Sequence, residues 1–373
     1  MAEQLRQPIV EQIYRLNLGP QHPSTHGVLR FLLDLDGEFI VKAEPIIGYG
    51  HRGHEKMGEN RTYRQFLPNT SRMDYLSGML YNHGFVLAVE KLAGIEVPPR
   101  AQHIRVICSE LNRISSHLLW FGTYVMDLGG FTPFLYAFDD REQILDILDR
   151  TSGSRLTYSY CRFGGVTNDI DAEFVAMTRA FVKRLRSRFP DYEGLVTKNV
   201  IFINRTRDVG AITPELARQY AVTGPNLRAC GIAFDTRKAE PYELYDRFDF
   251  EIPVGTRGDA LDRYYVRMEE MEQSCRIIEQ ALDQLPEGLY RNTRVPVPLK
   301  PPKGEVYFAF ESARGQTAYY LVSDGSRYPY RCHIRVPSFG NLSVLTEVLR
   351  GTLVADAISI LGSVDLVIPE IDR

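Results

Sequence analysis

The sequence predicts an α+β fold in which long helices form the centre and short β segments lie near both ends. Three observations support this prediction. Two apolar, strand-like runs occupy 13–18 and 28–35. Apolar residues recur at helical spacing through the middle of the chain. After Gly304 the pattern returns to that of strands.

Composition describes an ordinary globular protein with a large core. The chain has 373 residues, of which 44% are hydrophobic and 24% are charged. A formal net charge of −3 argues against general nucleic-acid binding. We expect an N-terminal β region over 1–53, a helical core over 54–291, and a Pro-rich connector with a C-terminal β/α region over 292–373.

Membrane segments and thiol sites are not expected in this sequence. No run approaches the ~18–20 apolar residues of a spanning helix, so any membrane role should go through partners. The polar N-terminus does not resemble a secretory leader. No C-x-x-C pair occurs, which predicts a reducing compartment and no thiolate cage for zinc or an iron–sulfur cluster. The five scattered cysteines are Cys108, Cys161, Cys230, Cys275 and Cys332.

A polar loop at 19–27, GPQHPSTHG, separates the first two apolar runs. Its Gly-Pro start and Gly end predict a tight turn. It contains two histidines and two hydroxyl side chains, and catalytic or binding residues often lie on such loops. From the residues alone, histidines that cap a turn are the simpler interpretation.

The run at 28–35 continues through Asp36-Gly37 into 38–47, which predicts a β-hairpin with a type I′ turn. The next residues, GYGHRG at 48–53, match G-x-G-x-x-G. We reject a dinucleotide site because the residues that follow lack both an apolar helix face and a βαβ context.

The central region is predicted to be helical. Asp74 is placed in the first turn of its helix, and Pro98-Pro99 begin the next. The charged run at 267–272 predicts an exposed face or a partner surface. The Pro-rich stretch 292–302 predicts an extended connector. Helices are expected at 74–92, 98–127, 133–150, 171–188, 214–220, 259–285 and 346–361, and strands at 305–310, 318–322 and 330–336.

One series of motifs resembles a known family. GPQHPSTHGVLR at 19–30 is similar to the signature of the D-subunit family of proton-pumping NADH-quinone oxidoreductase, respiratory complex I. The likeness extends over 16–373 and implies the fold of nickel–iron hydrogenase large subunits, with a central bundle of long helices. Further motifs follow in the family's order: PPR at 98–100, SELNR at 109–113, DLG at 127–129, RFGG at 162–165, PKGEVY at 302–307 and ESARG at 311–315.

The resemblance implies a quinone site with three catalytic residues. His26 and Tyr75 would donate hydrogen bonds and protons to quinone, which imidazole and phenol groups can do. Asp127 would partner the quinone-site histidine, because a carboxylate orients the ring and raises its pKa. The residues alone allow simpler roles: Tyr75 can be a buried tyrosine with a satisfied hydroxyl, and Asp127 can merely end its helix.

The resemblance also places Arg52, Arg72 and Arg113 near the terminal iron–sulfur cluster of a partner protein. A nearby cation stabilises the reduced cluster. For Arg113, a structural salt bridge is the alternative. Where the family often has a histidine, two residues after the arginine matching Arg155, this chain has Thr157. The 292–304 region is also shorter than in typical members.

The implied function is that of one subunit in an NADH:quinone oxidoreductase and translocase. The chain would bind no cofactor alone. Quinone would be the substrate, and a [4Fe-4S] cluster would lie on a partner that resembles the B subunit of the complex. Contacts with subunits B, C, H and I would hold the chain on the cytoplasmic side of a bacterial inner membrane.

Three alternatives remain at this point. A nickel–iron hydrogenase large subunit is disfavoured, because 47–51 and 365–369 lack the thiolate pairs that hold its metals. A component of a ferredoxin- or deazaflavin-fed membrane oxidoreductase would carry its electron input on other chains. A scaffold derived from hydrogenase would need neither His26 nor Tyr75.

Overall fold

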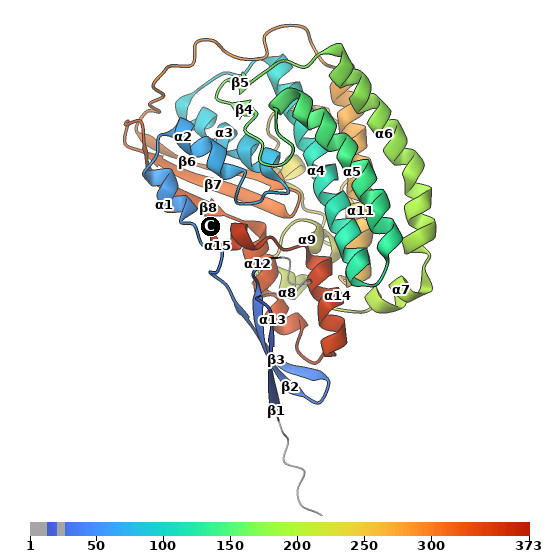
Figure 1. Ribbon diagram of the computed structural model, residues 1–373. Helices are drawn as coiled ribbons and strands as arrows, with labels where there is room; N and C mark the ends of the chain where they lie inside the picture. The colour runs from blue at the N-terminus through green and yellow to red at the C-terminus, as the bar shows by residue number, and fades with distance from the viewer. Residues whose placement is uncertain (1–12, 21–26) are drawn as a thin grey trace, which may run out of the picture.

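The computed structural model describes residues 13–20 and 27–373. The fold is α+β, as predicted, with a helical bundle beside two small antiparallel sheets (Figure 1). The segment 21–26, which includes His26, lies outside the described residues.

Four long helices lie side by side in the bundle (Figure 1): α4 (Pro99–Asp127), α5 (Phe131–Ser152), α6 (Ala172–Tyr192) and α11 (Ala260–Asp283). Helix α4 is buried along most of its length and contacts both α5 and α11. It begins at Pro99, whose ring fixes a helical φ where no backbone donor is needed. The predicted helices at these positions are confirmed.

Shorter helices connect the bundle to the sheets. Helix α3 (Gly78–Ala93) lies between α4 and the second sheet. The remaining helical segments before α11 are α1 (His54–Glu59), α2 (Tyr63–Thr70), η2 (Glu193–Thr197, π-helical), α7 (Val200–Thr206), α8 (Pro214–Gln219), α9 (Pro225–Ala229), α10 (Thr236–Ala239) and η3 (Tyr245–Arg247, 3₁₀).

The first sheet has the order β1-β2-β3, formed by β1 (Ile13–Leu18), β2 (Arg30–Asp36) and β3 (Phe39–Ile46). Strand β2 alternates strictly, and Phe31, Leu33 and Leu35 point into the protein. The second sheet, β6-β7-β8, is formed by β6 (Gly304–Ser312), β7 (Gly315–Ser323) and β8 (Pro329–Arg335) and packs on α3 and α1. A two-residue pair joins β4 (Cys161–Arg162) to β5 (Gly165–Val166).

The two ends of the chain share one hydrophobic core. The C-terminal helices are α12 (Pro337–Ser343), α13 (Leu345–Val348), α14 (Val354–Val364) and α15 (Ile368–Asp372). Their apolar residues cluster with those of the first sheet. The Ile40 N–H also donates to the Thr352 carbonyl at 2.9 Å, and the Gly351 N–H donates to the Ile40 carbonyl at 2.7 Å. The N-terminal hairpin is therefore held by the last part of the sequence.

The hairpin prediction is confirmed, but the turn type was wrong. Strand pairing reaches Asp36 and Phe39, so Gly37 and Glu38 form the connection. A type I′ turn needs positive φ at both positions. Gly37 has φ of 58°, whereas Glu38 is not among the non-glycine residues with positive φ.

Three further expectations need correction. Helix α3 begins at Gly78, because the Asp74 carboxylate accepts the Leu76 and Ser77 N–H groups and holds a turn instead. The helix expected at 346–361 is two helices, separated where Gly351 adopts φ of 79°. The charged run on α11 is only partly an exposed face, since Arg267 and Glu270 are buried whereas Glu269 is exposed.

Candidate functional site

Tyr75 lies in the turn between α2 and α3 and is half-buried. Burial raises the pKa of its hydroxyl, and the charges of Asp74 and Asp365 raise it further. The positive charge of Arg314 acts in the opposite direction. The phenol therefore keeps its proton at neutral pH and lies within the field of three fixed charges.

Those three charges form the Arg314 cluster, which we define as Arg314, Asp74 and Asp365. Arg314 comes from the turn between β6 and β7 and is fully buried. Its Nη1 donates to Asp74 Oδ2 at 2.7 Å, and its Nη2 donates to Asp365 Oδ1 at 3.2 Å. Asp365 Oδ2 is buried without a hydrogen-bond partner. The cluster thus joins the tyrosine turn, the ESARG turn and the end of α14.

Asp127 is half-buried at the last residue of α4. It lies beside α14, because a Cβ built on Gly362 would be 3.8 Å from Asp127 Oδ2. Its predicted partner His26 lies outside the described residues, so the pairing stays a prediction. Gly27, the residue after it, lies against α15, where its Cβ would be 3.5 Å from Ile368 Cγ1.

Arg52 and Arg72 are exposed and lie near the same buried histidine. Burial, followed by the charges of Arg52, His51 and Arg72, lowers the pKa of His54 to about 4. Both ring nitrogens of His54 are buried without a hydrogen-bond partner. The structure therefore places two exposed guanidinium groups within electrostatic range of one neutral imidazole.

Arg113 is placed differently from the other two arginines. It is fully buried and pairs with Glu110 at 3.1 Å. It also donates to the carbonyl oxygens of Ser312 and Glu311, at 2.7 and 2.8 Å. Its guanidinium is thus used within this chain, which fits the salt-bridge alternative.

The C-terminal helix α15 is the part of the site that sequence reasoning missed. Glu370 is fully buried against α3 and α12. Asp372 accepts the Gly48 and Gly50 N–H groups, each at 2.7 Å, and so holds the loop that carries Arg52. The available signal was the set of acidic residues in the otherwise apolar tail VDLVIPEIDR at 364–373.

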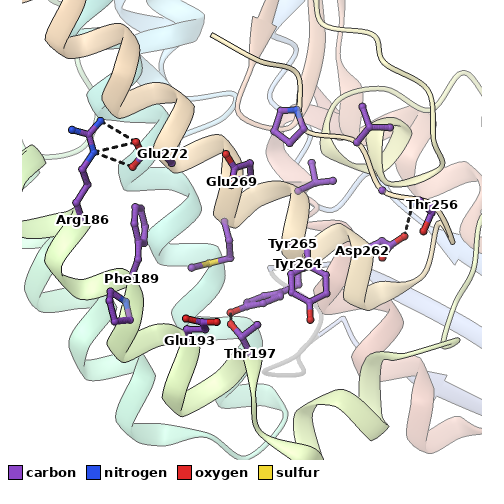
Figure 2. A pocket seen from close by; sticks show the side chains of 16 residues that line it. Arg186, Phe189, Glu193, Thr197, Thr256, Asp262, Tyr264, Tyr265, Glu269 and Glu272 are labelled. Carbon is purple, nitrogen blue, oxygen red and sulfur yellow. Dashed lines mark hydrogen bonds and ion pairs between the residues drawn. The ribbon is translucent and has the colours of Figure 1, made fainter.

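A groove that is well separated from these residues lies between α6, α11 and the loop before α11 (Figure 2). It has a volume of about 780 Å³ and is lined by Tyr264, Tyr265 and several glutamates, with Arg186 paired to Glu272 at its rim. It contains none of the residues predicted for quinone chemistry.

Within residues 13–20 and 27–373, no group of three or more His, Cys, Asp or Glu side chains is arranged to hold a metal ion. None of the helices described there combines the length and the apolar character needed to cross a membrane.

Comparison with known proteins identifies the class. The family model for the 49 kDa subunit of respiratory-chain NADH dehydrogenase matches residues 127–298 and 294–373. The chain is 82% identical over its full length, and over the relative's full length, to the D subunit of NADH-quinone oxidoreductase from Syntrophobacter fumaroxidans. It is 58% identical to the D subunit from Desulfotalea psychrophila, covering 97% of this chain and 98% of the relative. It is 54% identical to the D 2 subunit from Opitutus terrae, covering 97% of this chain and 91% of the relative.

The fold and the matches therefore define a component of a multisubunit NADH:quinone oxidoreductase. The chain belongs to the family of the 49 kDa subunit of respiratory-chain NADH dehydrogenase. Other subunits of respiratory complex I are its partners, and it is a peripheral subunit.

Proposed function

We propose that this chain forms part of the quinone-reduction site of its complex and supplies protons there. The observation that carries the proposal is the position of Tyr75, half-buried beside the Arg314 cluster. Reduction of quinone to quinol takes two electrons and two protons. Tyr75 would donate a hydrogen bond to one quinone oxygen and then transfer its proton as that oxygen becomes negative.

The Arg314 cluster suits such a donor. The phenolate left after proton transfer is stabilised by the nearby guanidinium of Arg314. The two carboxylates oppose a lasting negative charge on Tyr75 and favour its reprotonation. His26 is the proposed second donor, oriented by Asp127.

The electrons would come from a [4Fe-4S] cluster on a partner that resembles the B subunit, and this chain would bind no cofactor alone. Arg52 and Arg72 support this arrangement, because two exposed cations at one edge favour the reduced, more negative cluster. We also propose contacts with subunits C, H and I, and the cytoplasmic side of the inner membrane as the location. The fold would be that of hydrogenase large subunits, and the complex would couple quinone reduction to proton pumping.

The experiment measures NADH:quinone reductase activity of the whole complex carrying Tyr75→Phe or His26→Ala. We expect each to lower the quinone reductase rate by about a hundredfold, the scale of a lost general acid. Electron transfer from NADH to an artificial acceptor that bypasses quinone should persist and reports assembly. Tyr330→Phe is the matched control, because Tyr330 is 71% exposed on β8. Full quinone reductase activity in both variants would refute the proposal.

A further inference from the structure

Glu370, on helix α15, is a fully buried carboxyl group with neutral hydrogen-bond donors. The Tyr81 hydroxyl of α3 donates to Oε2, and the Ser338 N–H of α12 donates to Oε1 at 3.0 Å. Within the described residues, no cation forms an ion pair with it. Arg314, whose charge acts on this carboxyl, gives its donors to Asp74 and Asp365 instead.

A buried carboxylate without a paired cation is costly, so this geometry favours the protonated acid. Burial first, and then the negative charge of Asp74, raise the pKa of Glu370 to about 7. Arg314 and the two hydrogen bonds act in the other direction. Arg335 of β8 and Tyr319 of β7 also lie within electrostatic range of this carboxyl.

Glu370 and Tyr75 act on the same guanidinium. The groups whose negative charge acts on Arg314 include Asp365, Asp74, Glu370 and, once it has lost its proton, Tyr75. With Glu370 protonated, one positive charge faces two carboxylates. With Glu370 ionised, it faces three. The additional negative charge makes loss of the Tyr75 proton less favourable.

We propose that Glu370 carries a proton in the resting enzyme and sets, through the Arg314 cluster, how readily Tyr75 gives its proton to quinone. Glu370 is a positioning residue in this scheme and does not touch quinone. The proposal rests on the proposed role of Tyr75 and assigns to the C-terminal helix a part in controlling it.

The test is the pH profile of quinone reductase turnover in the intact complex at saturating quinone. In the wild type, the rate should fall by up to about tenfold between about pH 6 and pH 8, as a group near neutrality ionises. Glu370→Gln is isosteric and stays neutral, so its profile should be flat over this range. Glu287→Gln is the control, because Glu287 is exposed in the loop after α11. An assembled Glu370→Gln complex that keeps the wild-type step would overturn the proposal.

If the Glu370→Gln complex does not assemble, Tyr81→Phe tests the same proposal. Tyr81→Phe removes a hydrogen bond that stabilises the ionised carboxylate, so the step should move to higher pH. An unmoved step would also overturn the proposal.

Measuring Tyr75→Phe in parallel separates the two hypotheses. A slow Tyr75→Phe enzyme together with an unchanged Glu370→Gln profile contradicts only the role of Glu370. Full turnover in Tyr75→Phe contradicts the proposed function itself.

Discussion

Arg314 Nη1 and Asp74 Oδ2 lie 2.7 Å apart, across 240 residues of sequence. This ion pair joins the ESARG turn between β6 and β7 to the turn that carries Tyr75. Both side chains are completely buried. Removing Arg314 leaves two buried carboxylates without their cation, and the cost of this exceeds that of losing an ordinary surface contact.

Arg314→Met should destabilise the protein strongly. The change leaves Asp74 and Asp365 buried without their cation, which costs about 3–5 kcal/mol. The expected result is loss of this chain from purified complex, measured by quantitative mass spectrometry of subunit stoichiometry. Arg331→Met is the control, because the Arg331 side chain is 43% exposed and pairs at the surface with Glu55 and Glu59. Normal incorporation of Arg314→Met would show that the ion pair does not hold these turns together.

The buried carboxylates make the helical bundle sensitive to acid. Burial raises the pKa of Glu110, but the charges of Arg113 and Arg237 outweigh it and lower the pKa to about 2, from an ordinary 4.5. The pKa values of Glu243 and Glu270 are also lowered to about 2, since each carboxylate lies near buried cations. Because the folded-state pKa values are depressed, this stabilisation is complete above about pH 4.5 and is lost as pH falls toward 2.

Hydrogen exchange of α4 in the intact complex, corrected for intrinsic exchange rates, would measure this effect. Protection should decrease progressively as pH falls from about 4.5 toward 2. Glu110→Gln should show lower protection at neutral pH and a shallower decrease with acid. Protection that stays constant across this range would contradict the assignment of these pKa values.

Close packing between α3 and β6 predicts a steric defect. A Cβ on Gly84 would lie 2.3 Å from Phe310 Cε1, so Gly84→Ala must displace a fully buried ring. We expect destabilisation by about 1–3 kcal/mol, typical of overpacking. Thermal loss of quinone reductase activity should occur at lower temperature. Gly194→Ala, where the new Cβ has no neighbour within 4 Å, should leave the thermal profile unchanged. Equal profiles for the two variants would contradict the packing argument.

Thr157 predicts a partner-cluster potential with little pH dependence, because a neutral hydroxyl does not titrate near pH 7. Arg155, two residues before it, pairs with Asp146 and Glu142. Redox titration of the native complex, followed by electron paramagnetic resonance, should give nearly the same potential at about pH 6 and pH 8.

With Thr157→His, the reduction potential of the partner cluster should become pH-dependent. Its slope should approach about 59 mV per pH unit, the limit for one proton coupled to one electron. The matched control is Thr293→His, because Thr293 is exposed in the connector that precedes β6. A steep native dependence would show that another group titrates with the cluster.

The long helices were predictable because each carries local signals. Pro99 marks the start of α4, and Asp171 and Asp259 cap α6 and α11 with their side chains. The first hairpin was predictable from alternation and from Gly37. The turn at Asp74, after which α3 begins, was not predictable, since an aspartate there is compatible with both a helix start and such a turn.

The site was only partly predictable. The motif resemblance selected Tyr75, which lies near the Arg314 cluster, and Arg52, whose charge acts on His54. It gave no reason to select Glu370, whose significance depends on Tyr81 and Ser338, far away in sequence. It also grouped Arg113 with Arg52 and Arg72, although Arg113 is enclosed by the protein's own groups.

The sequence by itself determined the α+β class, the positions of the long helices and the family, because periodicity, capping residues and ordered motifs are properties of neighbouring residues. Only the tertiary structure decided which charges are buried and which of them are paired. The charged run on α11 illustrates the difference: Arg267 and Glu270 resemble surface residues in sequence but lie in the interior. Their partners come from distant segments, and the free energy of a buried charge depends on those partners.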